Sequence, residues 1–164
     1  GFEKYFASNM SAQFLLKEFI EALVKTIPDE LDFIVLDTPP ALGLITVNAM
    51  VASDEVYIPM QSQEFALSGF QSVITTVKGI QARLNQSLKI KGIFFTAHNP
   101  RTNISKQLTD MLRESYPNIV MDTYIPINVS LAESPSQKQS VFEYAPESKG
   151  AKAYDALTEE IINK

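Results

Sequence analysis

Apolar residues along the chain follow two alternating patterns. Helical spacing predicts five helices, at residues 12–26, 43–52, 66–84, 103–115 and from about 148 to the end. Short apolar runs between them predict four strands, at Phe33–Asp37, Glu55–Pro59, Ile90–Ala97 and Ile119–Ile125. Residues 128–147, which contain Pro135 and Pro146, are predicted to be mostly loop. Strands that alternate with helices predict an α/β fold, a mostly parallel sheet with helices on both faces.

The length of the chain predicts one folding unit. At 164 residues, with 45% hydrophobic and 20% charged residues, the chain can bury a substantial core. We expect a single α/β domain over 1–164, with a leading helical region at 1–30 and the core at 31–164. No apolar run is long enough to span a membrane, and the start does not have the pattern of a signal peptide. The first residue is Gly1 rather than Met, which favours a fragment or a processed chain.

Composition excludes several classes of site. The chain has no cysteine, so disulfides, zinc–thiolate sites and iron–sulfur clusters are excluded. A cytoplasmic location is the simplest interpretation. A net charge of −5 and a pI near 4.9 argue against a basic nucleic-acid surface over the chain as a whole, although a local basic patch is compatible with them.

The main candidate for chemistry is Asp37, which ends the apolar run that begins at Phe33. Because parallel sheets bind ligands at the carboxyl ends of their strands, this carboxylate is predicted to lie at the ligand edge. The rigid Pro39-Pro40 turn and Gly43 follow it, and a glycine permits close backbone approach to a phosphate. One interpretation of Asp37 is a Mg²⁺ or Mg²⁺-water ligand, and the other is a strand-end aspartate that caps the next turn.

Polar loops that contain proline follow the other three predicted strands, at Pro59–Phe65, His98–Asn103 and Ile125–Pro135. Asn99 carries the donors and acceptors that suit a purine base, and its alternative role is a turn former before Pro100. His98, the only histidine, is expected to be a surface or loop residue without a catalytic role.

Two kinds of active site are missing from the sequence. No serine, including Ser62, Ser68 and Ser105, lies in a G-x-S-x-G setting, so nucleophilic catalysis has no support. No G-x-x-x-x-G-K-[ST] loop is present to hold nucleotide phosphates. We therefore expect no ATP hydrolysis above background by this chain alone.

Taken together, these loops resemble the ParA/Soj family of plasmid and chromosome partition ATPases, in the wider group that includes MinD. The matching pieces span roughly residues 30–164 and are Phe33–Leu44, Ile58–Gln61, Glu64–Gly69, Asn99–Asn103, Ile125–Pro135 and Ser148–Ala151. The resemblance implies the later part of a P-loop NTPase-like domain, truncated at the N-terminus before the deviant Walker A loop. No cysteines, a short acidic tail and no tyrosine-rich tail separate the chain from the nitrogenase iron-protein, MinD and tyrosine-kinase branches.

The resemblance implies a switch that uses ATP and Mg²⁺. The parent protein would form a dimer on ATP, bind DNA non-specifically near the bacterial nucleoid, and hydrolyse ATP under stimulation by a DNA-bound ParB-like partner. By motif position, Asp37 would be the catalytic acid on the Mg²⁺ side. Thr38, Pro39 and Gly43 would belong to the loop that senses the γ-phosphate. Asn99 would lie beside the adenine, and the loop with Pro126 and Asn128 would flank the base from the other side.

DNA contacts have two interpretations. The candidate residues are Arg101, Lys106 and Arg113 near one predicted helix, and Lys138, Lys149 and Lys152 toward the C-terminus. Ile127 and Ser130 stand where the family often has basic residues. The alternative is a solvated basic rim, and we expect weak, salt-sensitive DNA binding by the chain alone. A second function class also stays open, a non-catalytic interaction module that kept the switch scaffold without the phosphate loop.

The missing phosphate-loop strand has a structural consequence. In this family that strand lies beside the strand that ends in Asp37, and its removal leaves unpaired backbone groups. We expect the gap to be closed by the Glu55–Pro59 strand, by another chain or by residues 1–10.

Overall fold

The computed structural model describes residues 12–27, 31–63 and 66–164. The chain divides into two compact units, which are described separately. The first comprises Gly1–Val56 and Gln71–Lys89, and the second comprises Tyr57–Phe70 and Ile90–Lys164.

The first unit is helical in its described part. It contains η1 (Ala12–Phe14), α2 (Leu15–Thr26), α3 (Leu44–Ala52) and most of α4 (Ala66–Arg83). The backbone N–H of Leu16 donates to Asn48 Oδ1 at 3.4 Å, which joins the start of α2 to α3. On α4, Ile74, Val77 and Ile80 are buried, at the three-residue spacing that places apolar side chains on one face of a helix.

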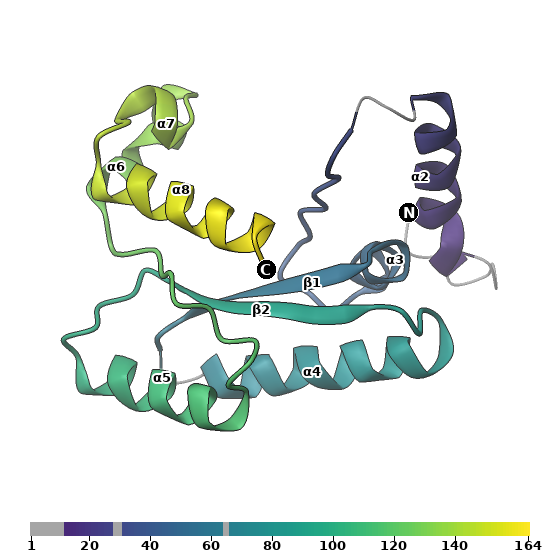
Figure 1. Ribbon diagram of the computed structural model, residues 1–164, viewed down its shortest axis with the longest axis horizontal. Coiled ribbons are helices and arrows are strands. Elements are labelled where there is room, and N and C mark those ends of the chain that lie inside the picture. The colour runs from purple at the N-terminus through teal and green to yellow at the C-terminus, as the bar shows by residue number, and fades with distance from the viewer. Residues whose placement is uncertain (1–11, 28–30, 64–65) are drawn as a thin grey trace. The chain divides into compact units, whose positions relative to one another are not determined.

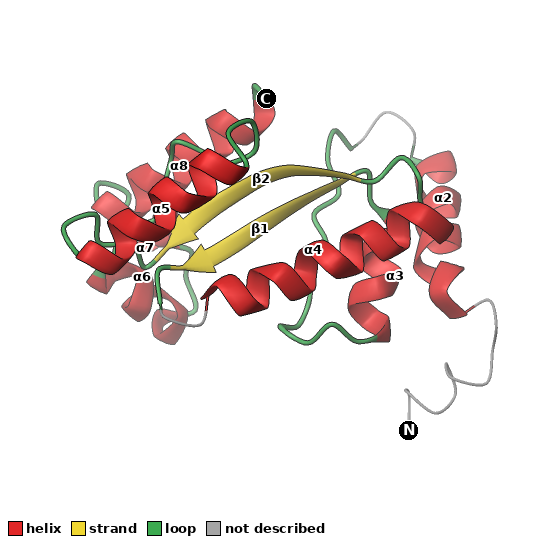
Figure 2. Cartoon of the chain, turned by 90° about the horizontal axis from the view of Figure 1, so that it is seen from below, coloured by secondary structure: helices red, strands yellow, loops and turns green. Residues whose placement is uncertain are grey.

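The second unit is built on a parallel pair of strands, β1 (Glu55–Gln61) and β2 (Lys89–Thr96). Figure 2 shows both arrows pointing the same way. The predicted fourth strand lies along β2, where isolated parallel bridges join Ile93 to Val120 and His98 to Pro126. Backbone N–H groups of Met121 and Ile125 donate to carbonyls of β2 at 2.8 Å. This segment therefore pairs with β2 at two separate points rather than along its whole length.

Helices cover both faces of β2. In Figure 1, α5 (Asn103–Ser115) and α8 (Lys149–Ile162) lie on opposite sides of the strands. Phe94 packs against a buried cluster of Met121, Ile125 and Leu157, and Leu157 belongs to α8. Because successive strand residues point to opposite faces, the buried Ile93 and Phe95 face the other side. The α/β fold with a parallel sheet flanked by helices is confirmed.

Gly92 on β2 permits close packing beside the neighbouring strands. A Cβ atom at this position would lie 2.6 Å from both Met121 Sδ and Tyr57 Cδ1. Such distances are shorter than van der Waals contact, so the absence of a side chain at Gly92 lets Tyr57 and Met121 pack over β2.

The prediction of a loop over residues 128–147 is wrong in part. The structure has α6 (Val129–Glu133), η2 (Ser134–Gln137) and α7 (Val141–Tyr144) in this range. Polar side chains cap two of these short helices. Asn128 Oδ1 accepts from Leu131 N at the start of α6, and Ser140 forms a reciprocal capping box with Glu143 at the start of α7.

The predicted strand at Phe33–Asp37 does not form. Residues 31–43 contain no helix or strand, and Phe33 and Val35 are 66% and 90% exposed. A strand needs a neighbour for its backbone groups, and among the described residues β1 pairs with β2 alone. The expected closure of the gap by the Glu55–Pro59 strand is not seen, while closure by residues 1–10 lies outside the described residues.

Glu160 on α8 holds the segment that precedes the pocket described below. Its two carboxylate oxygens accept hydrogen bonds from the backbone N–H groups of Asp122 and Thr123, each at 2.9 Å. Burial raises the pKa of Glu160, but these backbone bonds outweigh it and hold the pKa below its ordinary value of 4.5. The carboxylate thus satisfies two N–H groups of a segment that has no regular strand ladder at this point.

We expect Glu160→Gln to lower the free energy of unfolding by about 1 kcal/mol at neutral pH, because a neutral amide is a weaker acceptor on a half-exposed site. Since the folded-state pKa is depressed, this stability is present above the unfolded pKa and disappears as pH falls through the folded pKa. Urea unfolding at pH 7 and pH 3 checks it, with exposed Glu114→Gln as control. An equal loss at both pH values would contradict the assignment.

Candidate functional site

The segment from Asp37 to Gly43 belongs to the first unit. Asp37, Pro39 and Gly43 are exposed, and Thr38 is half-buried. The segment is tied to α3 by the Thr46 hydroxyl, which donates to the Ala41 carbonyl at 2.6 Å. Gly43 precedes α3, and no atom lies within 4 Å of where its Cβ would be. The fold does not require a glycine there, so its open backbone is available to an outside group.

Whether this segment suits Mg²⁺ depends on the ligand atoms that its side chains offer. In the part of the chain that the structure describes, no hydrogen bond or ion pair engages the Asp37 carboxylate, and no group of three or more His, Cys, Asp or Glu side chains could hold a metal. Mg²⁺ is commonly held by one or two carboxylates plus substrate phosphates and water. A single free carboxylate fits that mode of binding and does not fit a metal site made by the protein alone.

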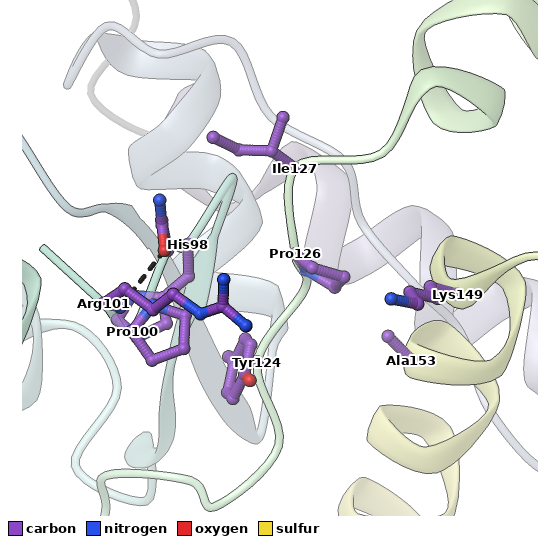
Figure 3. Close-up of a pocket in the computed structure, with 9 residues that line it drawn as sticks. His98, Pro100, Arg101, Tyr124, Pro126, Ile127, Lys149 and Ala153 are labelled. Carbon is purple, nitrogen blue, oxygen red and sulfur yellow. Dashed lines mark hydrogen bonds between the residues drawn. The ribbon is translucent and has the colours of Figure 1, made fainter.

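The second unit contains a pocket of about 600 Å³ at the carboxyl end of β2. It is lined by His98, Asn99, Pro100, Arg101, Tyr124, Pro126, Ile127, Lys149 and Ala153. In Figure 3 the residues that follow β2 lie on one side, Lys149 and Ala153 of α8 lie on the other, and Pro126 lies between them. None of these lining residues is acidic, whereas Arg101 and Lys149 carry positive charge. The pocket therefore favours a ligand with apolar or ring surfaces and electron-rich acceptors.

Asn99 and Arg101 share a turn at the edge of this pocket. The backbone N–H of Arg101 donates to Asn99 Oδ1 at 3.1 Å, the bond dashed in Figure 3. This local bond is the turn-forming role considered for Asn99, and it uses the side-chain oxygen. The side-chain amide donors are not used by that bond.

The opposite wall depends on Asn128 and Gly150. Asn128 is outside the pocket lining, and its Oδ1 accepts from Leu131 N at 3.2 Å to begin α6. A Cβ on Gly150 would lie 2.6 Å from Leu131 Cγ and 2.9 Å from Asn128 Oδ1. The absence of a side chain at Gly150 thus allows α8 to approach α6, which brings Lys149 to the pocket. Among the residues predicted for the base side, Asn99 and Pro126 line the pocket and Asn128 supports it.

His98 lies in the loop after β2, as the sequence predicts, but it is not a surface residue. It is 6% exposed, its ring stacks on Phe95 with centroids 5.0 Å apart, and it meets Tyr124 edge-on at 4.8 Å. Its Nδ1 lies 2.7 Å from Ser62 Oγ. Burial lowers the pKa of His98 from 6.5, so the ring is neutral at pH 7.

The sequence placed Ser62 and His98 in two loops at the same sheet edge but did not predict that they meet. Phe95 precedes His98 by three residues and Tyr124 follows it by 26 residues, so no local sequence pattern indicates the contact with Tyr124.

Comparison with known proteins identifies the family. Residues 1–90 match the family model described as AAA domain. The chromosome-partitioning ATPase Soj of Treponema pallidum is 37% identical over 144 residues, which is 88% of this chain and 57% of that protein. The chromosome partitioning protein ParA of Myxococcus xanthus is 34% identical over 164 residues, 100% of this chain and 56% of that protein. The chain belongs to the AAA domain family, as a ParA/Soj type.

A solved structure shows the same fold. The structure of cobyrinic acid a,c-diamide synthase from Mycobacterium smegmatis, with bound ATP analog and magnesium, matches with a TM-score of 0.78. It is 24% identical and the match covers 99% of this chain and 57% of that one. The chain thus spans a little over half the length of these relatives, and no helix in its described residues is long and apolar enough to cross a membrane.

The basic residues of this ParA/Soj-type chain differ in their availability. Arg113 donates to Asp122 Oδ1 at 2.9 Å, and Lys152 lies 2.8 Å from Glu147 Oε2. Arg101 and Lys149 line the pocket instead. Lys106 on α5 and Lys138 after η2 are exposed.

Proposed function

We propose that this chain is part of an ATP-dependent partition switch of the ParA/Soj type. The observation that carries the proposal is the pocket at the end of β2, which brings together Asn99 and Pro126 from two separate loops. The sequence resemblance predicts both residues beside the base of a nucleotide. The names of the relatives, chromosome-partitioning ATPase and chromosome partitioning protein, supply the cellular role.

In this proposal the pocket binds the adenine base of ATP. The Asn99 amide donates to a ring nitrogen, while Pro126 and Pro100 offer apolar surfaces to the ring faces. The segment that responds to the γ-phosphate contains Thr38, Pro39 and Gly43. The Asp37 carboxylate binds Mg²⁺ or one of its water ligands. Mg²⁺, when bound, supplies charge neutralisation to the phosphates. The phosphate loop itself is not among these 164 residues.

The wider proposal comprises a dimer, a ParB-like partner and non-specific DNA near the bacterial nucleoid. Arg113 is a weaker DNA candidate than the sequence suggested, because Asp122 already neutralises it. Of the six candidate cations, four have no carboxylate partner among the described residues: Arg101, Lys106, Lys138 and Lys149. Four cations on a chain of net charge −5 support only weak DNA binding, which two copies would strengthen.

Adenosine binding tests the base pocket. We expect adenosine to shift the NMR signals of residues that line the pocket in the 164-residue chain, and Asn99→Asp to weaken binding about fivefold. The aspartate keeps the oxygen that accepts from Arg101 but lacks the amide donors, so the loss reports one hydrogen bond to the base.

The control is Asn118→Ala, an exposed asparagine outside the pocket, which should leave the affinity unchanged. No binding of adenosine by the unaltered chain would contradict the base pocket and favour the non-catalytic interaction module.

A further inference from the structure

The turn that carries Asn99 is held in place from several directions. Ala97, at the end of β2, has a φ of 47°, a left-handed conformation that non-glycine residues rarely adopt. Next to it, the His98 backbone N–H donates to the Ile125 carbonyl at 3.0 Å, while the ring stacks on Phe95 and meets Tyr124 edge-on. A strained conformation persists only where its surroundings over-determine it. The backbone at the pocket edge is thus fixed through His98.

Ser62 adds a contact from a different loop. It follows β1, two residues before a segment outside the described residues, and its hydroxyl makes the 2.7 Å bond to His98 Nδ1. This bond joins the loop after β1 to the loop after β2, across 36 residues of sequence. Asn99 directly follows His98 in the chain, so a displacement of the imidazole moves the start of the turn that ends at Arg101.

The ring does not suit a catalytic role. A serine nucleophile needs a general base that is itself oriented by a third group, and the described surroundings of His98 include no acid. The charged residues that line the same pocket are Arg101 and Lys149, and burial lowers the pKa of His98 and so favours the neutral imidazole. A neutral, tightly packed ring with one fixed hydrogen bond is suited to positioning.

We propose that Ser62 and His98 form a positioning pair, in which the hydrogen bond lets the loop after β1 set the placement of Asn99 and Arg101 in the pocket. The identity of the ligand rests on the proposed function, but the coupling between the two loops does not. This bond gives a displacement of Ser62 a direct route to the pocket.

NMR of the ligand-free chain tests the coupling directly. His98 is the only histidine, so its imidazole nitrogen signals need no assignment among several rings. We expect Ser62→Ala to shift the Nδ1 signal, the Asn99 side-chain amide and the Arg101 backbone amide. Ser62→Thr keeps the hydroxyl and should restore all three signals. Ser136→Ala, which removes an exposed hydroxyl bonded to the Glu133 carbonyl, should move none of them.

A double-mutant cycle measures the effect on binding of adenosine. His98→Phe keeps an aromatic ring between Phe95 and Tyr124 but removes the nitrogen. We expect Ser62→Ala and His98→Phe each to weaken adenosine binding about fivefold, and the double variant to be no weaker than either one, because all three lose the same bond. A merely structural role would change thermal stability without this pattern in affinity.

The outcomes separate the two proposals. Unmoved Asn99 and Arg101 signals in Ser62→Ala, or additive losses in the double variant, would overturn the positioning pair. Shifted signals in a chain that does not bind adenosine would support the pair and contradict the base pocket.

Discussion

Replacing Asn85 by alanine is expected to lower the free energy of unfolding by about 3 kcal/mol. Asn85 is buried, and its side-chain nitrogen donates to the carbonyls of Met50, Val51 and Ser53 at 3.1, 3.2 and 2.7 Å. These carbonyls lie at the C-terminal end of α3, where helix carbonyls have no N–H partner within the helix. Alanine leaves them buried without a partner, and that desolvation penalty is the origin of the loss.

Asn85→Asp should be more damaging at neutral pH, because it replaces a donor with a carboxylate that faces the same carbonyl oxygens. The matched control is Asn163→Ala, whose amide also donates to a helix carbonyl, Glu159 O at 2.8 Å, but on an exposed C-cap of α8. Water replaces that bond, so the control should cost less than about 0.5 kcal/mol. Urea unfolding followed by circular dichroism compares the three variants. Equal losses for Asn85→Ala and Asn163→Ala would show that burial does not set the cost.

The helices could be predicted because their information is local. The predicted helices at 12–26 and 103–115 match α2, which ends at Thr26, and α5, which Thr102 caps by accepting from Ser105 N. The signal for α7 was also present, since Ser140 and Glu143 have the three-residue spacing of a capping box. The two prolines in this region predict a loop, but the caps at Asn128 and Ser140 start helices in the structure.

The strands were harder to predict because pairing is not local. Phe33–Asp37 has the composition of a buried strand, yet a strand requires backbone partners that a sequence pattern does not supply. The fourth predicted strand pairs with β2 through an isolated bridge at Val120, and a second bridge joins Pro126 to His98 just beyond both segments. An apolar run thus predicts a tendency to be buried, and the neighbour decides whether a ladder forms.

The sequence predicts which loops meet at the candidate site, but it does not predict how their side chains pack. Asn99 and Pro126 could be brought together because both follow strands, and parallel strands end at the same edge of a sheet. That rule places a loop but not a side chain within it. The burial of His98 depends on Ser62 and Tyr124, whose side chains reach it from two other loops.

We expect Asp37→Asn to reduce ATP turnover about a hundredfold or more in a protein that joins a phosphate-binding loop to this chain. Phosphoryl transfer depends on positioned charge, and removing one preorganised electrostatic group commonly has an effect of that size. The 164-residue chain alone should show no turnover above background, because it has no loop to hold the phosphates. Turnover of the chain alone that disappears in Asp37→Ala would contradict this expectation.

Asp37→Asn is expected to separate an effect on turnover from an effect on stability. Asp37 is exposed and makes no hydrogen bond or ion pair with the described residues, so its replacement should leave thermal unfolding unchanged. Asp32→Asn is the matched control, because Asp32 is another exposed carboxylate in the same segment without helix or strand. The control should keep full turnover, and both variants should bind adenosine as the unaltered protein does. If Asp37→Asn keeps turnover, the carboxylate does not serve Mg²⁺ or its water, and its role reduces to the local turn before α3. If turnover and adenosine binding fall together, Asp37 acts through the fold rather than through the phosphates.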